Sequence, residues 1–443
     1  MPLPRDRALF VLLLLAALLG LAYNAVILLG YGPDEPRHLA YVELLFREHT
    51  FPRQNPDGTE YAGAHSSHPP LYYLLLLPFY VLLRALPHAG TWHALRLVSH
   101  ALCLLSLPFL WQIARRAGGG DRAFAALVVA QIALLPLFGM TEGIVNNDSA
   151  LLLAVSVFLW LLAVKYPDDE GFKSALALGV CFGLGGLCKG TAFLCDFAAL
   201  GAYLWAQNGA RGLRSPRPWL RLALTLGVAA AVAGPWYARN MSLYGSWQPI
   251  PRGFAPADMG WLPRAEYGPL LQMFHPNFAP LLGQATWGIF YSLWSQKDWI
   301  PPALRLGVYL LFVAYCLAAL IGAGRHKWGR RTSSENAAED APAAEDRSAR
   351  IALWSGAAAF AVTALACLQI ALFVHWGQHE GGRYLLPALV GLSIPLARGW
   401  RGLIGARRLP ALTTIWGIVL LSLNGLALYW LLHYLNPTFG PKG

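Results

Sequence analysis

Long apolar stretches recur along this chain, separated by polar segments. A helix that crosses a bilayer needs about 20 mostly apolar residues, and eleven stretches fit that pattern. We therefore predict an all-α integral membrane protein with about 11 transmembrane helices. The stretches lie at roughly 8–30, 93–114, 123–140, 149–164, 174–188, 190–207, 219–236, 303–323, 351–374, 384–397 and 409–433.

A twelfth apolar stretch, His68 to Leu86, is interrupted by Pro78. The basic residues decide how it is placed, because Lys and Arg concentrate in cytoplasmic loops. If the stretch lies along the outer face without crossing, the N-terminus is cytoplasmic and every basic loop is inside. If it crosses, all basic loops except the N-terminal one move outside. We predict a juxtamembrane helix here. The basic segments are 5–7, 115–122, 165–173, 211–221, 325–350 and 398–408.

This topology leaves two long extracytoplasmic loops, 31–92 and 237–302, and two short outer segments, 141–148 and 375–383. Residues 1–300 form a predicted transmembrane module that includes both long loops. Residues 301–443 form a C-terminal group of helices with a cytoplasmic linker at 325–350. The Ala-rich, acidic part of that linker is predicted to be disordered.

Composition supports the membrane assignment. Hydrophobic residues make up 56% of the chain and charged residues 13%, whereas soluble domains carry about 25% charged residues. The net charge of +11 belongs to the cytoplasmic loops and does not indicate nucleic acid. The six cysteines all lie in apolar segments, so neither a disulfide framework nor zinc-ligand spacing follows.

The stretch GPDEPRHLAYVELL follows the first apolar run and contains two adjacent acids, Asp34 and Glu35. Pro36 suits the first position of a helix, which makes Glu35 the expected cap and Asp34 the residue before it. The helix is predicted to lie flat in the membrane interface, because its apolar residues share one face. Two interpretations stay open: a capped helix with a solvated acid, or a general base, which is typically worth about 10²- to 10⁴-fold in rate. The apolar face comprises Leu39, Val42, Leu45 and Phe46.

Asp34, Glu35 and His38, followed by HPPLYY at His68 to Tyr73, resemble the first outer loop of the GT-C glycosyltransferases that use polyprenyl-phosphate sugars. These include protein O-mannosyltransferases and lipid A aminoarabinose transferases. The resemblance implies a GT-C fold and inverting transfer of a sugar from a polyprenyl phosphate, such as undecaprenyl phosphate, to an acceptor hydroxyl. Further segments similar to the family follow in order: NNDSALLLAVSVFLWLL (146–162), GLGGLCKGTAFL (183–194), GPWYARNMSLYG (234–245) and GGRYLLPAL (381–389).

The resemblance assigns catalysis to the acidic pair, with Asp34 as the first choice for general base and Glu35 as the second. A phosphate leaving group needs cations, and Arg239 and Arg383 lie at the outer boundary of two spans. Both could instead reach lipid head groups. Lys189 lies between two apolar runs, where a cation is costly and usually paired or functional.

Asp148 has two open roles: it can cap the fourth span together with Asn147, or it can be a second acid of the site. His38, His68 and Tyr384 are assigned to substrate binding.

Metal ligation is the less favoured interpretation of the clustered histidines. His65 with His68, and His375 with His379, could ligate a metal, but the second pair lacks the order HExxH and its glycines favour a loop. No metal site and no required cofactor are expected, and the need for a divalent cation is left open.

Two other functions compete with transfer. A polytopic lipid or sugar transporter would show related halves and polar sites at mid-depth, whereas this chain has no evident repeat and its polar residues gather on one side. A non-catalytic homologue that binds lipid-linked sugar is the other alternative. The expected partners are a polyprenyl-phosphate-linked sugar donor, a lipid, glycan or protein acceptor, and the bilayer, with no nucleic acid. The expected location is the plasma (inner) membrane, with multiple spans and the active site outside.

Overall fold

The computed structural model describes residues 6–168, 171–249, 301–333, 343–373 and 380–435, with a few positions between 282 and 292. Within these ranges the chain is helical and has no β-strand. The principal helices are α1 (Arg7–Val26), α2 (Glu35–Glu48), α3 (Leu71–Leu83), α4 (His88–Ala117), α5 (Arg122–Ala133), α6 (Pro136–Glu142), α7 (Asp148–Trp160), α8 (Phe172–Cys188), α9 (Ala192–Gly212), α10 (Pro216–Tyr244), α13 (Pro302–Ser333), α14 (Ala343–Phe373), α15 (Val390–Ile404) and α16 (Leu409–Trp430).

Each of the eleven predicted apolar stretches lies on a helix, which confirms an all-α multi-pass membrane protein. Among the described residues, seven helices are long and apolar enough to cross a bilayer. The pair α5 and α6, bent by 64°, makes an eighth if it counts as one span. Helix α8, with 17 residues, and α15, with 15, are not among these seven helices. Length and composition therefore support seven or eight full spans and leave the count of eleven unconfirmed.

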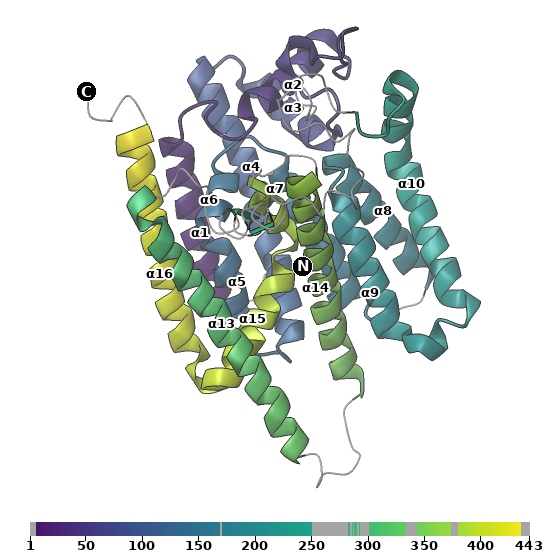
Figure 1. Ribbon diagram of the computed structural model, residues 1–443. Coiled ribbons are helices and arrows are strands. Elements are labelled where there is room, and N and C mark those ends of the chain that lie inside the picture. Colours follow the sequence, from purple (N-terminus) through teal and green to yellow (C-terminus); the bar gives the residue numbers. More distant parts are fainter. Residues whose placement is uncertain are drawn as a thin grey trace.

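Helix α3 is the core of the ambiguous stretch at His68 to Leu86. Its 13 residues extend about 20 Å at about 1.5 Å per residue, whereas the hydrocarbon core is about 30 Å thick. Figure 1 shows α3 beside α2 at one end of the bundle. Its length and position agree with the predicted juxtamembrane helix.

Helix α2 starts one residue earlier than predicted. Asp34, not Glu35, is the N-cap residue, and Glu35 is the first residue of the helix. Asp34 adopts a left-handed backbone conformation, with φ 60° and ψ 7°, and its side chain makes no capping hydrogen bond. Because the side chain of Asp34 does not cap the helix, it can interact with other groups.

The apolar face of α2 is buried by protein, which corrects the prediction that it lies flat in the membrane interface. Leu39, Val42 and Leu45 are buried in a small core at this end of the bundle. The rings of Tyr41 on α2 and Tyr73 on α3 stack in parallel, with centroids 3.7 Å apart. The two short helices therefore form one layer, because each covers the apolar face of the other.

Helices of the two predicted modules pack directly against one another in the described parts of the chain. Helix α14 lies along α9, and α16 lies along α5 (Figure 1). Glycines allow the closest crossings: a Cβ atom on Gly391 of α15 would overlap the backbone of Gly356 on α14. Small residues commonly permit such close packing between membrane helices.

A buried ion pair connects the end of the bundle to the outer loop. Arg96 of α4 and Glu35 of α2 both have 0% exposed side chains. Arg96 donates from Nε and Nη2 to the two carboxylate oxygens, at 2.8 Å each. The guanidinium also donates to carbonyl oxygens near the end of α1, those of Asn24, Ile27 and Leu28.

Glu35 is saturated by these and two backbone donors. The N–H of Val145, just before α7, donates to Oε1 at 2.9 Å, and the N–H of Gly30 donates to Oε2 at 3.1 Å. The Glu35 carboxylate thus connects α4, the segment before α7 and the segment after α1.

We expect Arg96→Leu to lower the free energy of unfolding by about 3–5 kcal/mol, because it leaves the Glu35 carboxylate buried without its partner. Thermal unfolding in detergent measures the change. Arg47→Leu, which removes an exposed arginine of α2, is the control and should stay within about 0.5 kcal/mol of wild type.

The double variant Glu35→Leu/Arg96→Leu should be more stable than Arg96→Leu alone, since it removes the uncompensated charge as well. Equal losses in the single and double variants would contradict the pairing.

Candidate active site

Asp34 carries the more accessible of the two adjacent acids. Its side chain is 34% exposed, and its Oδ2 accepts a hydrogen bond from Nη2 of Arg383 at 3.1 Å. Its Oδ1 lies 3.5 Å from Nη1 of Arg37. Burial by itself raises the pKa of Asp34, but neighbouring cationic groups, Arg383 first among them, lower it on balance below the usual 3.8. The carboxyl is therefore ionised at neutral pH.

Glu35 has a different environment although it is the next residue. Its carboxylate is fully buried and all of its described bonds go to Arg96 and to two backbone N–H groups. The predicted catalytic pair is thus divided between an accessible acid and an acid that holds the framework.

Arg383 and Lys189 both lie close to one aromatic ring, that of Tyr384. The Cζ atom of Arg383 is 5.0 Å from the centroid of the Tyr384 ring, and the Nζ atom of Lys189 is 4.9 Å from the same centroid. Arg383 also donates to the Tyr384 hydroxyl at 3.1 Å. Both cations come from breaks between spans, Arg383 from η5 (Glu380–Ala388) and Lys189 from the turn between α8 and α9.

One nitrogen of Arg383 is available to an anion. Nη1 is buried and has no hydrogen-bond partner among the described residues. A buried guanidinium N–H without an acceptor is costly.

Lys189 forms an ion pair with Asp148, the first residue of α7. Asp148 is buried and is the first helical residue. The N-cap is Asn147, whose side chain makes no capping hydrogen bond, so the predicted capping role of Asp148 is not seen. The residue before it, Asn147, donates from Nδ2 to the carbonyl oxygen of Cys188 at 3.2 Å. The start of α7 and the end of α8 are therefore tied together beside the two cations.

His38 and His68 meet at one phenol. Their Nδ1 atoms lie 2.8 Å and 3.1 Å from the hydroxyl oxygen of Tyr73. Burial lowers the pKa of His38 and of His68 well below 6.5, because it disfavours the charged imidazolium. Burial likewise raises the pKa of the Tyr73 phenol, so this triad is neutral at pH 7.

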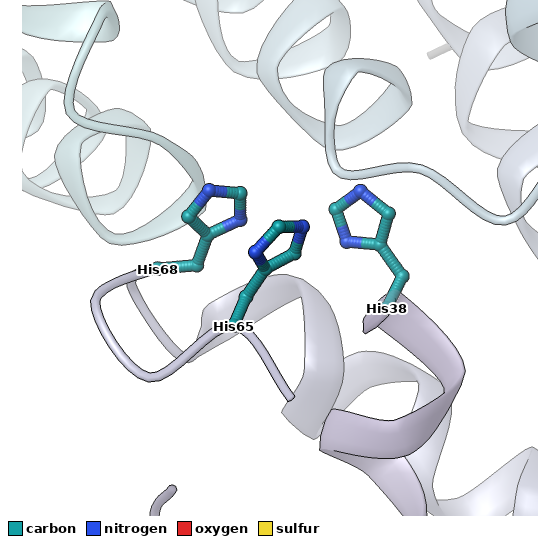
Figure 2. A group of neighbouring side chains, drawn as sticks. All are labelled: His38, His65 and His68. Carbon is teal, nitrogen blue, oxygen red and sulfur yellow. The ribbon is translucent and has the colours of Figure 1, made fainter. Parts of the chain in front are cut away.

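His65 joins the same group of rings (Figure 2). Its ring stacks on that of His68 with centroids 3.9 Å apart, and its Nδ1 lies 3.2 Å from Oε1 of Glu60. Tyr73, Glu60 and Arg96 carried no assignment from the sequence. Tyr73 lies on α3, Glu60 in the loop after α2, and Arg96 on α4.

Arg239 has a separate position in the described contacts. It donates from Nη2 to the carbonyl oxygen of Pro52 at 2.8 Å and to that of Phe51 at 3.4 Å. Its guanidinium lies over the ring of Trp236 at 4.7 Å. It anchors the first outer loop to the end of α10.

The structure brings Asp34, Asp148, Lys189, Arg383 and Tyr384 into one cluster at the end of the bundle. His38, His65 and His68 lie next to it: after burial, the charge of Lys189 is among the causes that lower the pKa of His38 and of His68, and the His65 ring stacks on that of His68. The other histidine pair weighed as metal ligands, His375 and His379, lies outside the described residues.

Comparison with curated protein sequences gives no match. Residues 67–236 match the family described as dolichyl-phosphate-mannose-protein mannosyltransferase. This segment covers α3 to most of α10 and includes His68, Asp148 and Lys189.

Solved structures match over nearly the whole chain. The archaeal oligosaccharyltransferase AglB of Archaeoglobus fulgidus, in complex with an inhibitory peptide and a dolichol-phosphate, has a TM-score of 0.52 and 15% identity, and covers 96% of this chain and 56% of AglB. The same enzyme tethered to an acceptor peptide gives a TM-score of 0.53 and 16% identity, with coverage of 96% and 55%.

ArnT of Cupriavidus metallidurans bound to undecaprenyl phosphate has a TM-score of 0.41 and 18% identity, and covers 89% of this chain and 77% of ArnT. The chain spans a little over half the length of AglB. The chain has the fold of the GT-C membrane glycosyltransferases, as the motifs of the first outer loop implied.

We expect Lys189→Met to destabilise the protein by about 3 kcal/mol, because it leaves Asp148 buried beside an apolar side chain. The melting temperature in detergent measures this loss. Lys173→Met, at an exposed lysine on α8, should have little effect.

Adding Asp148→Asn to Lys189→Met should recover much of the lost stability, because the unpaired charge is gone. A double variant that melts lower than Lys189→Met alone would contradict the ion pair as the origin of the effect.

Proposed function

We propose that this protein is a glycosyltransferase that moves a sugar from a polyprenyl phosphate to an acceptor hydroxyl at the extracytoplasmic end of its helix bundle. One observation carries the proposal: an ionised carboxylate, Asp34, is held beside the guanidinium of Arg383, whose Nη1 has no partner among the described residues. A nucleophile's base and an anion-binding group thus lie side by side.

The reaction needs a base near the acceptor oxygen and cations near the leaving phosphate. The acceptor oxygen attacks C1 and gives its proton to Asp34, the bond between C1 and the phosphate oxygen breaks, and the phosphate departs as an anion. Inversion follows from a single displacement. Phosphate needs no general acid if cations stabilise its developing charge.

Arg383 and Lys189 supply that stabilisation in the proposal. Arg383 offers a planar fork that suits phosphate oxygens, and Lys189 adds a second positive charge near the same Tyr384 ring. Asp148 holds Lys189 in position.

The depressed pKa of Asp34 supports its assignment as the base that is already ionised before the acceptor arrives. We assign Glu35 to positioning, because its bonds to Arg96 and the backbone leave its oxygens engaged. Arg239 holds the first outer loop over the bundle in the same way.

His38 and His68 are assigned to sugar hydroxyls. Neutral imidazoles both donate and accept hydrogen bonds, which suits an uncharged polyol better than a phosphate. Their connection through Tyr73 fixes the ring orientations.

AglB, a solved structure of the same fold, contains dolichol-phosphate, which supports a polyprenyl phosphate as the donor carrier here. The proposal leaves the acceptor as a lipid, a glycan or a protein. The charge distribution of the loops supports a plasma-membrane protein with a cytoplasmic N-terminus.

Asp34→Asn should lower the transfer rate by about 10²- to 10⁴-fold, because the acceptor then lacks its general base. The assay follows loss of a radiolabelled sugar from a polyprenyl-phosphate donor in the presence of a membrane extract as acceptor. Asp57→Asn, in an exposed turn of the same loop, should retain the wild-type rate.

Full transfer by Asp34→Asn would exclude Asp34 as the base. Absence of transfer by wild type with every donor tested, combined with retained donor binding, would favour the non-catalytic homologue. Movement of the intact donor across vesicles would favour the transporter.

Arg383→Gln should weaken the binding of undecaprenyl phosphate by about 10- to 100-fold, the equivalent of one lost hydrogen bond to a charged group. Native mass spectrometry of the detergent-solubilised protein measures the bound lipid over a titration. Arg53→Gln, an exposed arginine of the outer loop, is the matched control. Equal affinities in the two variants would remove Arg383 from the phosphate site.

A further inference from the structure

Three histidines of the first outer loop gather into one cluster. His38 comes from α2, and His65 and His68 come from the segment before α3 (Figure 2). One ring nitrogen of each can be chosen so that all three atoms lie within 4.8 Å of one another. His38 and His65 are buried and His68 is half-buried. Three imidazoles packed this closely call for an explanation beyond sugar binding.

The orientation of His65 leaves an unsatisfied lone pair. Its Nδ1 faces Oε1 of Glu60, and because a carboxylate oxygen accepts hydrogen bonds, Nδ1 carries the proton and donates it in a hydrogen bond. Nε2 of the neutral ring then has a lone pair and no proton. His65 is only 7% exposed, and its Nε2 atom is buried without a hydrogen-bond partner among the described residues.

Tyr73 cannot satisfy both of the other rings in the same manner. Its hydroxyl has one proton and lies within hydrogen-bond distance of Nδ1 on both His38 and His68. It donates to one ring and must accept from the other, whose neutral Nε2 is then unprotonated. At least two of the three rings therefore offer a free lone pair.

We propose that His38, His65 and His68 form a site for a transition-metal ion of the zinc class. Imidazole nitrogen is a preferred ligand of such ions, and three protein ligands with an open fourth position are typical of exchangeable zinc sites. A tetrahedral site with Zn–N bonds of about 2.0–2.1 Å separates its nitrogens by about 3.3 Å. The rings need to approach one another by about 1.5 Å, which side-chain rotation provides.

The groups around the rings fit a ligand set. Glu60 accepts from the distal nitrogen of His65, as carboxylates do behind zinc-bound histidines. Arg37 lies 3.6 Å from the other oxygen of Glu60 and holds it in place. The hydroxyl of Tyr73 orients the other two rings.

The local charge also permits a cation. The positive charges of Arg37, Lys189 and Arg383 act on His38, and three carboxylates in the same cluster offset them. Lys189 and Arg383 are each paired with one of these carboxylates. The carboxylates are those of Asp34, Glu60 and Asp148.

The site shares His38 and His68 with the proposed sugar site, but its test does not depend on transfer. These two rings would be ligands of the metal, and its fourth position would be open to water or an oxygen of the substrate. Metal content is measurable without donor or acceptor, so a failure of the proposed transfer leaves the metal result intact.

The test uses the full chain purified in detergent with an affinity tag that contains no histidine. Zn²⁺ is added and then removed by dialysis, and bound zinc is measured by inductively coupled plasma mass spectrometry. We expect about one ion per chain for wild type and for His88→Ala, which removes an exposed histidine of α4, and near-complete loss for His65→Ala.

Substitution with Co²⁺ gives a second readout, because tetrahedral nitrogen coordination intensifies its visible absorption. Glu60→Gln should retain the spectrum but weaken metal affinity by about 10- to 100-fold, as expected for loss of a carboxylate behind a ligand. This variant decides the question if His65→Ala does not fold.

Several results would overturn the site. The site is excluded if the wild-type protein retains no zinc and gives no Co²⁺ spectrum. Zinc retained equally by His65→Ala, or affinity unchanged in Glu60→Gln, would show that the metal is bound elsewhere.

Discussion

The ion pair between Glu35 and Arg96 is the interaction on which the outer end of this protein depends. Arg96 lies within α4, yet its guanidinium meets the last carbonyls of α1 and the first side chain of α2. Through Glu35 the same network reaches the backbone before α7. A helix terminus buried without partners is unstable, and this one side chain satisfies the end of α1. The loop that carries the candidate site therefore starts from a fixed point.

Two adjacent acids take opposite roles because of one backbone conformation. Asp34 is left-handed at φ 60°, so the chain reverses between it and the first turn of α2. Glu35 then points into the bundle towards Arg96, and Asp34 points towards Arg383, which is 349 positions away in the sequence. Left-handed geometry at a residue other than glycine is strained and often marks a functional position. Here this conformation lies between a carboxylate that meets Arg96 and one that meets Arg383.

The candidate site alternates charges that would be unstable alone. Asp34 pairs with Arg383, and Asp148 pairs with Lys189, and both cations lie within about 5 Å of the centroid of the Tyr384 ring. Buried charges of this kind persist when each is paired and hydrogen-bonded. The neutral group of His38, His68 and Tyr73 borders them. A charged half and a neutral half of one site match a substrate that is a phosphate on one side and a sugar on the other.

The apolar pattern by itself determined the helical membrane class, the apolar part of each long helix and the short helix α3, because a backbone in lipid must satisfy its own hydrogen bonds. It did not predict that α13 continues to Ser333 and that α14 starts at Ala343, within the segment predicted to be a linker. The motifs also located Asp34, Asp148, Lys189 and Arg383 at one end of the bundle. Only the tertiary structure decided what each residue meets. Arg96 and Glu60 look like ordinary charged residues in the sequence. The partner of Arg96, Glu35, is 61 positions away, and Arg37, a partner of Glu60, lies on the other side of a loop. The apolar face of α2 could have packed against lipid or against protein, because both remove it from water. In the structure it packs against protein. Such pairings depend on how the helices pack, which local periodicity does not record.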